Sequence, residues 1–313
     1  MAASSRDVLD LIGNTSLVPL RHIAPANGAR ILLKLESENP TGNMKDRMAL
    51  AMIEAAEKDG RLKPGGAVVE YTGGSTGASL ALVCAAKGYP LHIVSSDAFA
   101  QEKLDHMRIL GAKLTVVPSE GGRQTEALTR ALIETAREIQ KETSAFWTDQ
   151  FNNPDPIPAY HTMAEEIWAQ TDGRIDGFAH GVGTAASLRG NAEGLRRRNP
   201  KIKIVAVEPA ESPVLCGCKS GARKVDGIGL GFVPPLWQEG LADAVAPIST
   251  EAARAMALRL AREEGLFSSV STGANVIAAL CLAETLGRDA TVVTVMVDTD
   301  MKYPRGFGER LTA

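Results

Sequence analysis

Residues 67–95 read AVVEYTGGSTGASLALVCAAKGYPLHIVS, and this stretch decides the fold class. Ala67–Tyr71 and Leu91–Ser95 are short apolar runs with β-branched residues, typical of buried strands. Between them, Gly77–Lys87 has a helical composition and stops at Gly88. A strand, a helix and a second strand in so short a span predict a βαβ unit, whose two strands pair in parallel.

The same alternation continues along the chain and predicts an α/β protein with largely parallel sheets. Further strands are expected at 31–35, 113–117, 177–180, 204–208 and 291–297, and further helices at 44–58, 101–110, 125–142, 163–170, 250–264, 274–286 and from 185 onward. The loop at 152–158, rich in Asn and Pro, interrupts the alternation. We therefore expect two three-layer lobes, a smaller one at 40–148 and a larger one comprising 1–39 and 149–313.

The composition excludes several classes of protein. With 34 basic and 37 acidic residues among 313, the net charge of −3 leaves no basic footprint for nucleic acid. No apolar run reaches the length of a membrane span, and the N-terminus lacks the pattern of a secretory signal. Four cysteines indicate no disulfide framework, so a cytoplasmic location is expected. Cys216-Gly-Cys218 lacks a second ligand pair, so no metal site is expected.

The turn Thr72–Gly77 follows a predicted strand and contains three glycines. Such a turn lets main-chain N–H groups meet an anion at the start of the next helix, which suits a carboxylate or a phosphate. Residues 73–77 also match the G-x-S-x-G pattern of serine hydrolases. No histidine follows His180, which disfavours that alternative.

A second turn, Gly181–Ser187, again lies between a predicted strand and a helix. It fits the G-x-G-x-x-A pattern of dinucleotide binding, and Glu208 follows at the spacing of a ribose ligand. The same turn can also bind a single phosphate monoester. Taken alone, it predicts an NAD-dependent oxidoreductase.

A third segment, Asn39–Arg47, places Lys45 at the junction of a loop and a helix. A lysine in that position is usually a solvated helix start. Alternatively it forms a Schiff base, with an amine whose pKa is lowered by desolvation.

Taken together and in this order, the three segments resemble the cysteine synthase and cystathionine β-synthase family of pyridoxal phosphate enzymes, of fold type II. The resemblance covers nearly the whole chain. The matching segments are Ile12–Thr15, Asn39–Arg47, Thr72–Gly77, Gln150–Pro154, Glu166–Gly173, Gly181–Thr184, Val205–Pro209, Ser212–Leu215, Gly227–Phe232 and Ser271–Ala274.

The resemblance implies a role for each matching residue, with pyridoxal 5'-phosphate in a cleft between the lobes. Lys45 matches the lysine that binds the cofactor covalently and acts as the catalytic base. The cofactor's phosphate matches Gly183, Thr184, Ala185, Ala186 and Ser187, and its ring matches Ser75 and Ser271. The residues that match the substrate site are Thr72, Gly73, Thr76, Gln150, Gly227 and Ile228. His180 is expected to be structural.

The resemblance also implies the reaction, a β-replacement on a small amino acid by a small nucleophile. The simplest member of the class makes L-cysteine and acetate from O-acetylserine and sulfide, through an aminoacrylate. Alternatives within the class are cystathionine synthesis, cysteine desulfhydration, diaminopropionate synthesis and dehydration of serine or threonine. A non-catalytic relative is a further alternative. Members are usually homodimers, and no nucleic-acid or membrane partner is expected.

The chain departs from the family's pattern near the expected cofactor. The usual T-S-G-N-T-G has Gly73 in place of Ser and Ser75 in place of Asn, and Asn43 stands where Ser is usual. In the phosphate turn, Ala185 and Ala186 replace two glycines and Ser187 replaces a threonine. An alanine at a position that requires a positive φ is strained, so a rearranged turn is expected.

Overall fold

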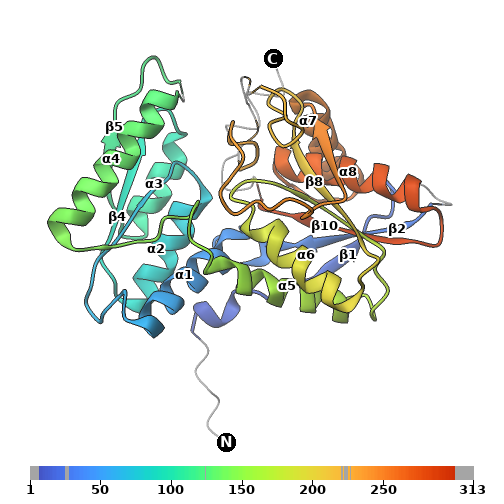
Figure 1. Cartoon of the computed structure of the whole chain (residues 1–313), viewed down its shortest axis with the longest axis horizontal. Helices are drawn as coiled ribbons and strands as arrows, with labels where there is room; N and C mark the ends of the chain where they lie inside the picture. Colours follow the sequence, from blue (N-terminus) through green and yellow to red (C-terminus); the bar gives the residue numbers. More distant parts are fainter. Residues whose placement is uncertain are drawn as a thin grey trace, which may run out of the picture. The chain divides into compact units, whose positions relative to one another are not determined.

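The computed structural model describes residues 7–24, 28–123, 125–219, 221, 225 and 227–299. This part of the chain divides into two compact units (Figure 1). The first comprises the described residues up to Ile12 together with Lys45–Pro156, and the second comprises Gly13–Met44 together with the described residues from Ile157 onward. The chain therefore passes between the units three times. The crossings at Met44 and Pro156 lie several residues later than the predicted limits, and the described residues up to Ile12 belong to the first unit, although the prediction placed residues 1–39 in the larger lobe.

The first unit contains a parallel sheet with the strand order β5-β4-β3-β6. Its strands are β3 (Val68–Tyr71), β4 (Leu91–Ser96), β5 (Lys113–Val117) and β6 (Phe146–Trp147). Its helices are η1 (Leu9–Leu11), α1 (Lys45–Asp59), α2 (Ser75–Lys87), α3 (Gln101–Ile109) and α4 (Glu126–Thr143). The predicted βαβ unit is therefore β3-α2-β4.

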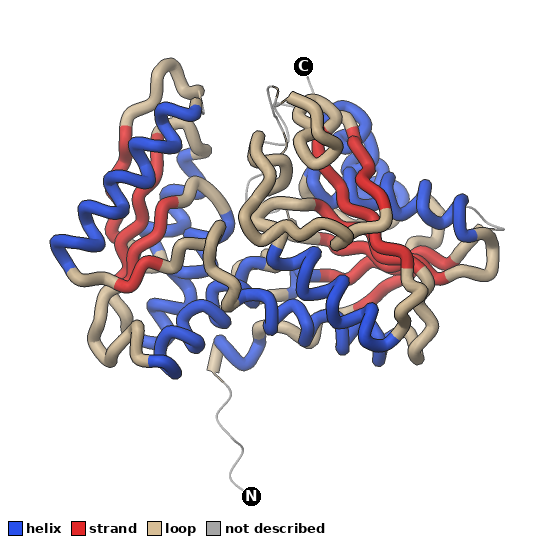
Figure 2. The backbone as a smooth tube through the Cα atoms, in the orientation of Figure 1, coloured by secondary structure: helices blue, strands red, loops and turns tan. Residues whose placement is uncertain are grey.

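Helices cover this sheet because its strands are apolar on both faces (Figure 2). Leu128 and Leu132 of α4 pack against Val69 and Val94 on one face. Side chains alternate along a strand, so the equally buried Val68 lies on the other face. There α2 packs against β3 and β4.

The second unit contains a sheet with the strand order β1-β2-β10-β7-β8-β9. Its strands are β1 (Leu17–Pro19), β2 (Arg30–Leu35), β7 (Gly177–Gly181), β8 (Lys203–Pro209), β9 (Ala244–Ile248) and β10 (Thr291–Met296). Its helices are η2 (Glu36–Glu38), α5 (Pro156–Gln170), α6 (Ala186–Arg198), α7 (Thr250–Glu263) and α8 (Val270–Leu286). All neighbouring strands are parallel except the pair β1 and β2. The predicted fold class, α/β with largely parallel sheets, is confirmed.

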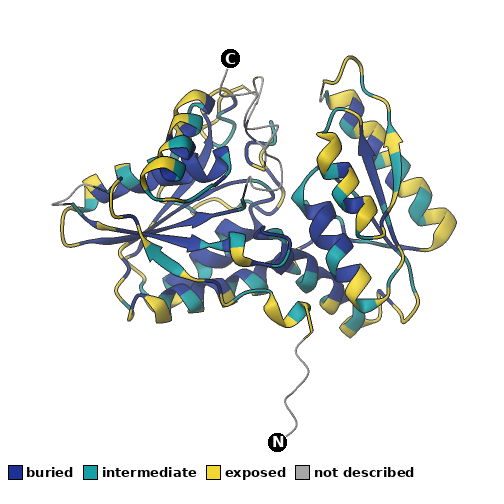
Figure 3. Cartoon of the chain, turned by 180° about the vertical axis from the view of Figure 1, so that it is seen from behind, coloured by how far each residue is buried: buried dark blue, intermediate teal, exposed yellow. Residues whose placement is uncertain are grey.

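One part of the core of this unit lies between α7, α8 and the sheet, whose central strands are buried (Figure 3). A buried ion pair adds a polar connection from the sheet to α5. The Nζ atom of Lys34, fully buried on β2, lies 2.7 Å from Glu166 Oε2 and also donates to the carbonyl of Thr15 and to Gln170 Oε1. The family resemblance at Glu166–Gly173 thus includes two residues that hold a buried lysine.

The observed elements differ from the predicted ones in several places. Strands β1 and β6 were not predicted, because runs of three and two residues carry little periodicity. Helix α5 begins at Pro156 rather than at 163, because proline is well tolerated in the first turn of a helix. Strand β9, which contains Pro247, was not predicted, and it is tolerated because it lies at the edge of the sheet. Helix α8 begins at Val270, so Ser271 lies in its first turn. Residues 220, 222–224 and 226 of the Gly-rich loop lie outside the described part.

Helix α6 begins after Ala185, whose φ of 70° and ψ of −14° lie in the left-handed region. The turn therefore keeps the positive φ that a glycine would adopt there, and the strain expected from the sequence is present at Ala185. Ala186, also replacing a glycine, is the first helical residue and has no such strain.

We expect Ala185→Gly to leave stability unchanged or to raise it slightly. Both Ala185 and Ala186 are buried, so Ala186→Gly is a matched control that loses the same methyl group. Relief of the left-handed strain favours the first variant, and helix propensity disfavours the second, so their free energies of unfolding should differ by about 1–2 kcal/mol. Urea denaturation measures this difference, and equal losses for the two variants would contradict it.

Candidate active site

The turn after β3 is held by main-chain pairing in the first unit. The N–H of Thr72 donates to the carbonyl of Val94 over 2.9 Å, and Thr72 Oγ1 accepts from the N–H of Gly74 over 3.2 Å. Helix α2 then begins at Ser75, which is half-buried. In the described part of the chain, the N–H groups of Ser75 and Thr76 have no hydrogen-bond acceptor. They lie at a helix N-terminus, where a carboxylate is favoured.

Gln150 lies beside this turn because β6 pairs in parallel with β3. Its Oε1 accepts from the Thr76 hydroxyl over 2.8 Å, and its Nε2 approaches the carbonyl of Tyr71 at 3.4 Å. Thr76 and Gln150 are both buried. The structure thus brings together Thr72, Thr76 and Gln150, which the sequence assigned to the substrate carboxylate.

Glu70, which the sequence analysis did not single out, lies behind this group. Its Oε2 accepts from Thr148 Oγ1 over 2.5 Å and from the N–H of Gln150 over 3.0 Å, while Oε1 accepts from the N–H of Tyr71 over 2.8 Å. Burial raises the pKa of this carboxyl to about 7, with a smaller contribution from the charge of Asp149, against the lowering effect of its three donors. A charged residue within an apolar strand was the sequence signal that could have identified it.

The space that a side chain at position 73 would need is occupied by an aromatic ring. A Cβ atom at Gly73 would overlap the half-buried ring of Phe99, which follows β4. The departure from Ser at this position is therefore paired with an aromatic residue on a neighbouring loop of the same unit.

Lys45 is the half-buried first residue of α1. The next residue, Asp46, accepts a 2.6 Å hydrogen bond from the hydroxyl of Ser79 on α2, and both side chains are fully buried. This contact joins the start of α1 to the helix that begins at the Thr72–Gly77 turn. Asn43, two residues before Lys45, is buried in the second unit, where it pairs with Asp298.

In the second unit, the turn after β7 forms a cup of main-chain N–H groups. Within the described residues, no acceptor is recorded for the N–H groups of Gly183, Thr184, Ala185 and Ser187. The N–H of Ala186 is directed to Thr184 Oγ1 at 3.4 Å instead. Four donors at the start of a 13-residue helix are an arrangement that can bind a phosphate group.

The loop at Gly227 and Ile228 packs against this cup. A Cβ atom at Gly183 would overlap the carbonyl oxygen of Gly227, and one at Gly181 would lie 2.6 Å from Ile228 Cγ2. The N–H of Gly229 also donates to the carbonyl of Val182 over 3.0 Å. The cup and this loop are therefore closely packed and joined by a main-chain hydrogen bond.

Ser271 lies in the first turn of α8 and is buried. Its hydroxyl lies 2.9 Å from the hydroxyl of Ser269. Ser271 presents a neutral hydroxyl group, and its predicted position beside the cofactor ring stays a prediction.

The interpretation of Glu208 as a ribose ligand is not supported by its contacts. Glu208 is buried, and its two carboxylate oxygens accept from the N–H groups of Leu215 and Cys216 over 2.8 and 3.1 Å. The cup therefore fits a phosphate monoester such as that of pyridoxal phosphate, while the acidic residue of the NAD pattern is used to fold a loop.

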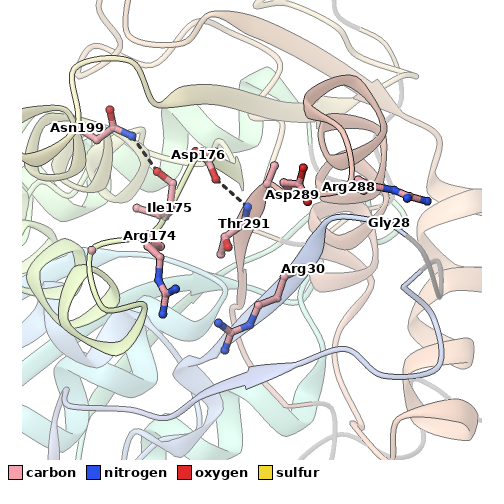
Figure 4. A pocket seen from close by; sticks show the side chains of 11 residues that line it. Gly28, Arg30, Arg174, Ile175, Asp176, Asn199, Arg288, Asp289 and Thr291 are labelled. Atoms are coloured by element: carbon pink, nitrogen blue, oxygen red, sulfur yellow. Dashed lines mark hydrogen bonds between the residues drawn. The ribbon is translucent and has the colours of Figure 1, made fainter.

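A hollow of about 610 Å³ lies at the amino-terminal ends of the parallel strands in the second sheet, opposite the ends that lead into the cup (Figure 4). Arg30, Asp176 and Thr291 line it at the amino-terminal ends of β2, β7 and β10, whereas the cup follows the carboxyl end of β7. Figure 4 shows Thr291 donating to Asp176 on its wall. None of the site residues predicted from the sequence is among its described lining residues, so this hollow is separate from the candidate site.

The described residues contain no group of three or more His, Cys, Asp and Glu side chains that could hold a metal ion. No helix among them is both long and apolar enough to cross a lipid bilayer.

The first unit has a helix N-terminus that can bind an anion and a lysine at the start of another helix, and the second unit has a further helix N-terminus that can bind an anion. These are groups of the kind that a carboxylate substrate and a phosphorylated cofactor require. The family model described as "Pyridoxal-phosphate dependent enzyme" matches residues 8–298. The chain belongs to this family and is a pyridoxal 5'-phosphate-dependent enzyme of fold type II.

Several relatives cover nearly the whole chain. A cysteine synthase from Staphylococcus aureus is 40% identical over 300 residues, covering 95% of this chain and 94% of the relative. The crystal structure of a cysteine synthase from Entamoeba histolytica has a TM-score of 0.89 at 34% identity, covering 97% of this chain and 91% of that one. A hydrogen sulfide-producing enzyme from Fusobacterium nucleatum has a TM-score of 0.88 at 35% identity, with coverages of 96% and 99%.

The contact between Gly73 and Phe99 predicts that Gly73→Ser lowers stability by about 1–3 kcal/mol, the cost of overpacking. Phe99→Ala removes the ring, so the serine should then be tolerated, and the two substitutions should couple in a double-mutant cycle. Gly74→Ser is the control, because a Cβ there meets no atom within 4 Å. Thermal unfolding measures all four variants, and equal losses at Gly73 and Gly74 would contradict the prediction.

The raised pKa of Glu70 predicts that the free energy of unfolding falls as the pH rises. The folded state holds the proton of Glu70 up to about pH 7, whereas the unfolded chain releases it near the ordinary value of 4.5. The unfolded state thus binds fewer protons in this window, and the folded state should lose about 3 kcal/mol between pH 4.5 and pH 7. Glu70→Gln cannot titrate, so the difference in unfolding free energy between the two proteins should change by this amount. A difference that stays constant from pH 4 to 8 would refute the assignment.

Proposed function

We propose that this enzyme is a cysteine synthase, which forms L-cysteine and acetate from O-acetylserine and sulfide. The observation that carries the proposal is the first-unit arrangement of Lys45, the Thr72–Gly77 turn and Gln150. There Lys45, the proposed base, is followed by Asp46, which accepts a hydrogen bond from Ser79 on α2. The N-terminus of α2 suits a substrate carboxylate, and Thr76 in its first turn contacts Gln150. The Staphylococcus aureus and Entamoeba histolytica relatives, both named cysteine synthase, support the choice of reaction.

In this proposal each residue has a role that its environment permits. The Lys45 amine binds the cofactor covalently and, once released, takes the α-proton of the substrate as a general base. Residues Gly183–Ser187 bind the phosphate through main-chain N–H groups and the serine hydroxyl. Residues 72, 73 and 76, with Gln150, orient the substrate carboxylate. When bound, pyridoxal phosphate supplies the electron sink for the α-carbon.

Two side chains then influence which reaction follows. The neutral hydroxyl of Ser271 does not hold the pyridine nitrogen in its protonated form, which favours prompt loss of the β-substituent over reprotonation. Ser75, at the first position of α2, is shorter than the asparagine that is usual in the family. Gly227 and Ile228, packed against the cup, are proposed to line the substrate site.

A second candidate is the elimination of sulfide from cysteine, with the same binding steps. The specific observation is the altered Thr72–Gly77 turn, in which position 73 carries a glycine instead of the usual serine and the ring of Phe99 occupies the space of a side chain there. The similarity to the hydrogen sulfide-producing enzyme of Fusobacterium nucleatum agrees with this candidate.

The test compares Lys45→Ala with Lys58→Ala, an exposed lysine on the same helix. Turnover of O-acetylserine with sulfide should fall by about 100- to 10,000-fold in the first variant, the usual contribution of a general base. The second variant should match the wild type. Full turnover by Lys45→Ala would refute the role of Lys45. A wild-type protein that releases sulfide from cysteine, but forms no cysteine from O-acetylserine and sulfide, would establish the second candidate.

The proposal also includes a cytoplasmic location and a homodimer. All four cysteines are free thiols, which is consistent with a reducing compartment. The homodimer rests on the family resemblance alone, and light scattering on the purified protein measures it directly.

A further inference from the structure

His180 connects the phosphate cup to the interior of the second unit. It is the fourth residue of β7 and is 1% exposed. Its Nε2 atom lies 2.8 Å from Ser187 Oγ in the first turn of α6. Its Nδ1 atom lies 3.3 Å from Asn275 Nδ2 on α8.

The orientation of the Asn275 amide is set by a third group. Asn275 Nδ2 donates to the carbonyl of Val295 on β10 over 2.9 Å. A carbonyl oxygen can only accept, so the atom that faces Val295 must be the amide nitrogen. The same nitrogen faces His180, and Nδ1 of His180 must therefore accept a hydrogen bond.

This contact determines the tautomer of His180. A neutral imidazole with an accepting Nδ1 carries its proton on Nε2. Nε2 then donates to Ser187 Oγ, and this oxygen acts as an acceptor toward His180. The hydroxyl proton of Ser187 is consequently directed away from the histidine, on the residue whose own N–H belongs to the cup.

We propose that Asn275 and His180 are positioning residues that hold the Ser187 hydroxyl as a donor to the cofactor's phosphate. With the opposite tautomer, Nε2 would accept from Ser187 and the cup would lose one donor. The inference rests on the proposed assignment of Gly183–Ser187 as the phosphate site. It assigns a function to a histidine that was expected to be only structural.

The experiment compares pyridoxal phosphate with pyridoxal, which lacks the phosphate group. Dissociation constants are measured by equilibrium dialysis with the full-length protein freed of cofactor. His180→Asn cannot reach Ser187 and should weaken binding of pyridoxal phosphate by about tenfold to a hundredfold, the effect of losing a hydrogen bond to a charged group. Binding of pyridoxal should not change. His180→Gln can place its amide nitrogen near the position of Nε2, so it should restore most of the affinity.

Two further readouts separate positioning from general stability. In a Ser187→Ala background, His180→Asn should cause no additional loss of affinity. The phosphorus NMR shift of the bound phosphate should change in His180→Asn and Ser187→Ala, and should stay at the wild-type value in His180→Gln. If His180→Asn does not fold, Asn275→Ala replaces it, since this variant removes the donor that sets the tautomer.

Three outcomes would overturn the inference. An equal loss of affinity for pyridoxal and its phosphate would show that His180 is merely structural. Unchanged binding of pyridoxal phosphate by His180→Asn would show that Ser187 needs no positioning. A wild-type protein that binds both ligands equally would overturn the assignment of the cup itself, which distinguishes failure of the proposed function from failure of this inference.

Discussion

The parallel pairing of the strands is the constraint on which the rest of the structure depends. Because neighbouring strands run in one direction, β3 and β6 end at the same edge of the first sheet, and Gln150 meets Thr76 there. In each unit, the strand before the turn, β3 or β7, is followed by a helix whose first N–H groups lack partners within the helix. Among the described residues, no acceptor is found for the N–H groups of Ser75 and Thr76, or for those of Gly183, Thr184, Ala185 and Ser187. Each unit thus has a helix N-terminus that can bind an anion.

The departures from the family's pattern have a structural explanation in both turns. Ala185 adopts the left-handed conformation that a glycine would adopt, and helix α6 begins directly after it. At Gly73, the missing side chain leaves space for the ring of Phe99. The predicted rearrangement of the phosphate turn is therefore absent at Ala185, and the strain is borne by that residue.

Beside each turn lies a buried polar group whose hydrogen bonds connect it to residues around the turn. Glu70 accepts from the main chain of Gln150, and His180 contacts the hydroxyl of Ser187. Burying a carboxyl or an imidazole is unfavourable unless its hydrogen bonds are made. Displacement of Gln150 or of Ser187 would break one of these bonds, so each buried group constrains the residue that it contacts. Gln150 and Ser187 are the residues that the proposal assigns to the substrate carboxylate and to the cofactor's phosphate.

The sequence by itself determined the alternation of strands and helices, the three loops and Lys45, because periodicity and glycine placement are local properties. It did not show Glu70 beside Gln150, or His180 beside Asn275, because these contacts join residues 80 and 95 positions apart. It also missed β9 and the true start of α5, since proline is tolerated at a sheet edge and in a first helical turn. Only the tertiary structure decided those contacts, because the register of parallel strands sets which distant residues meet.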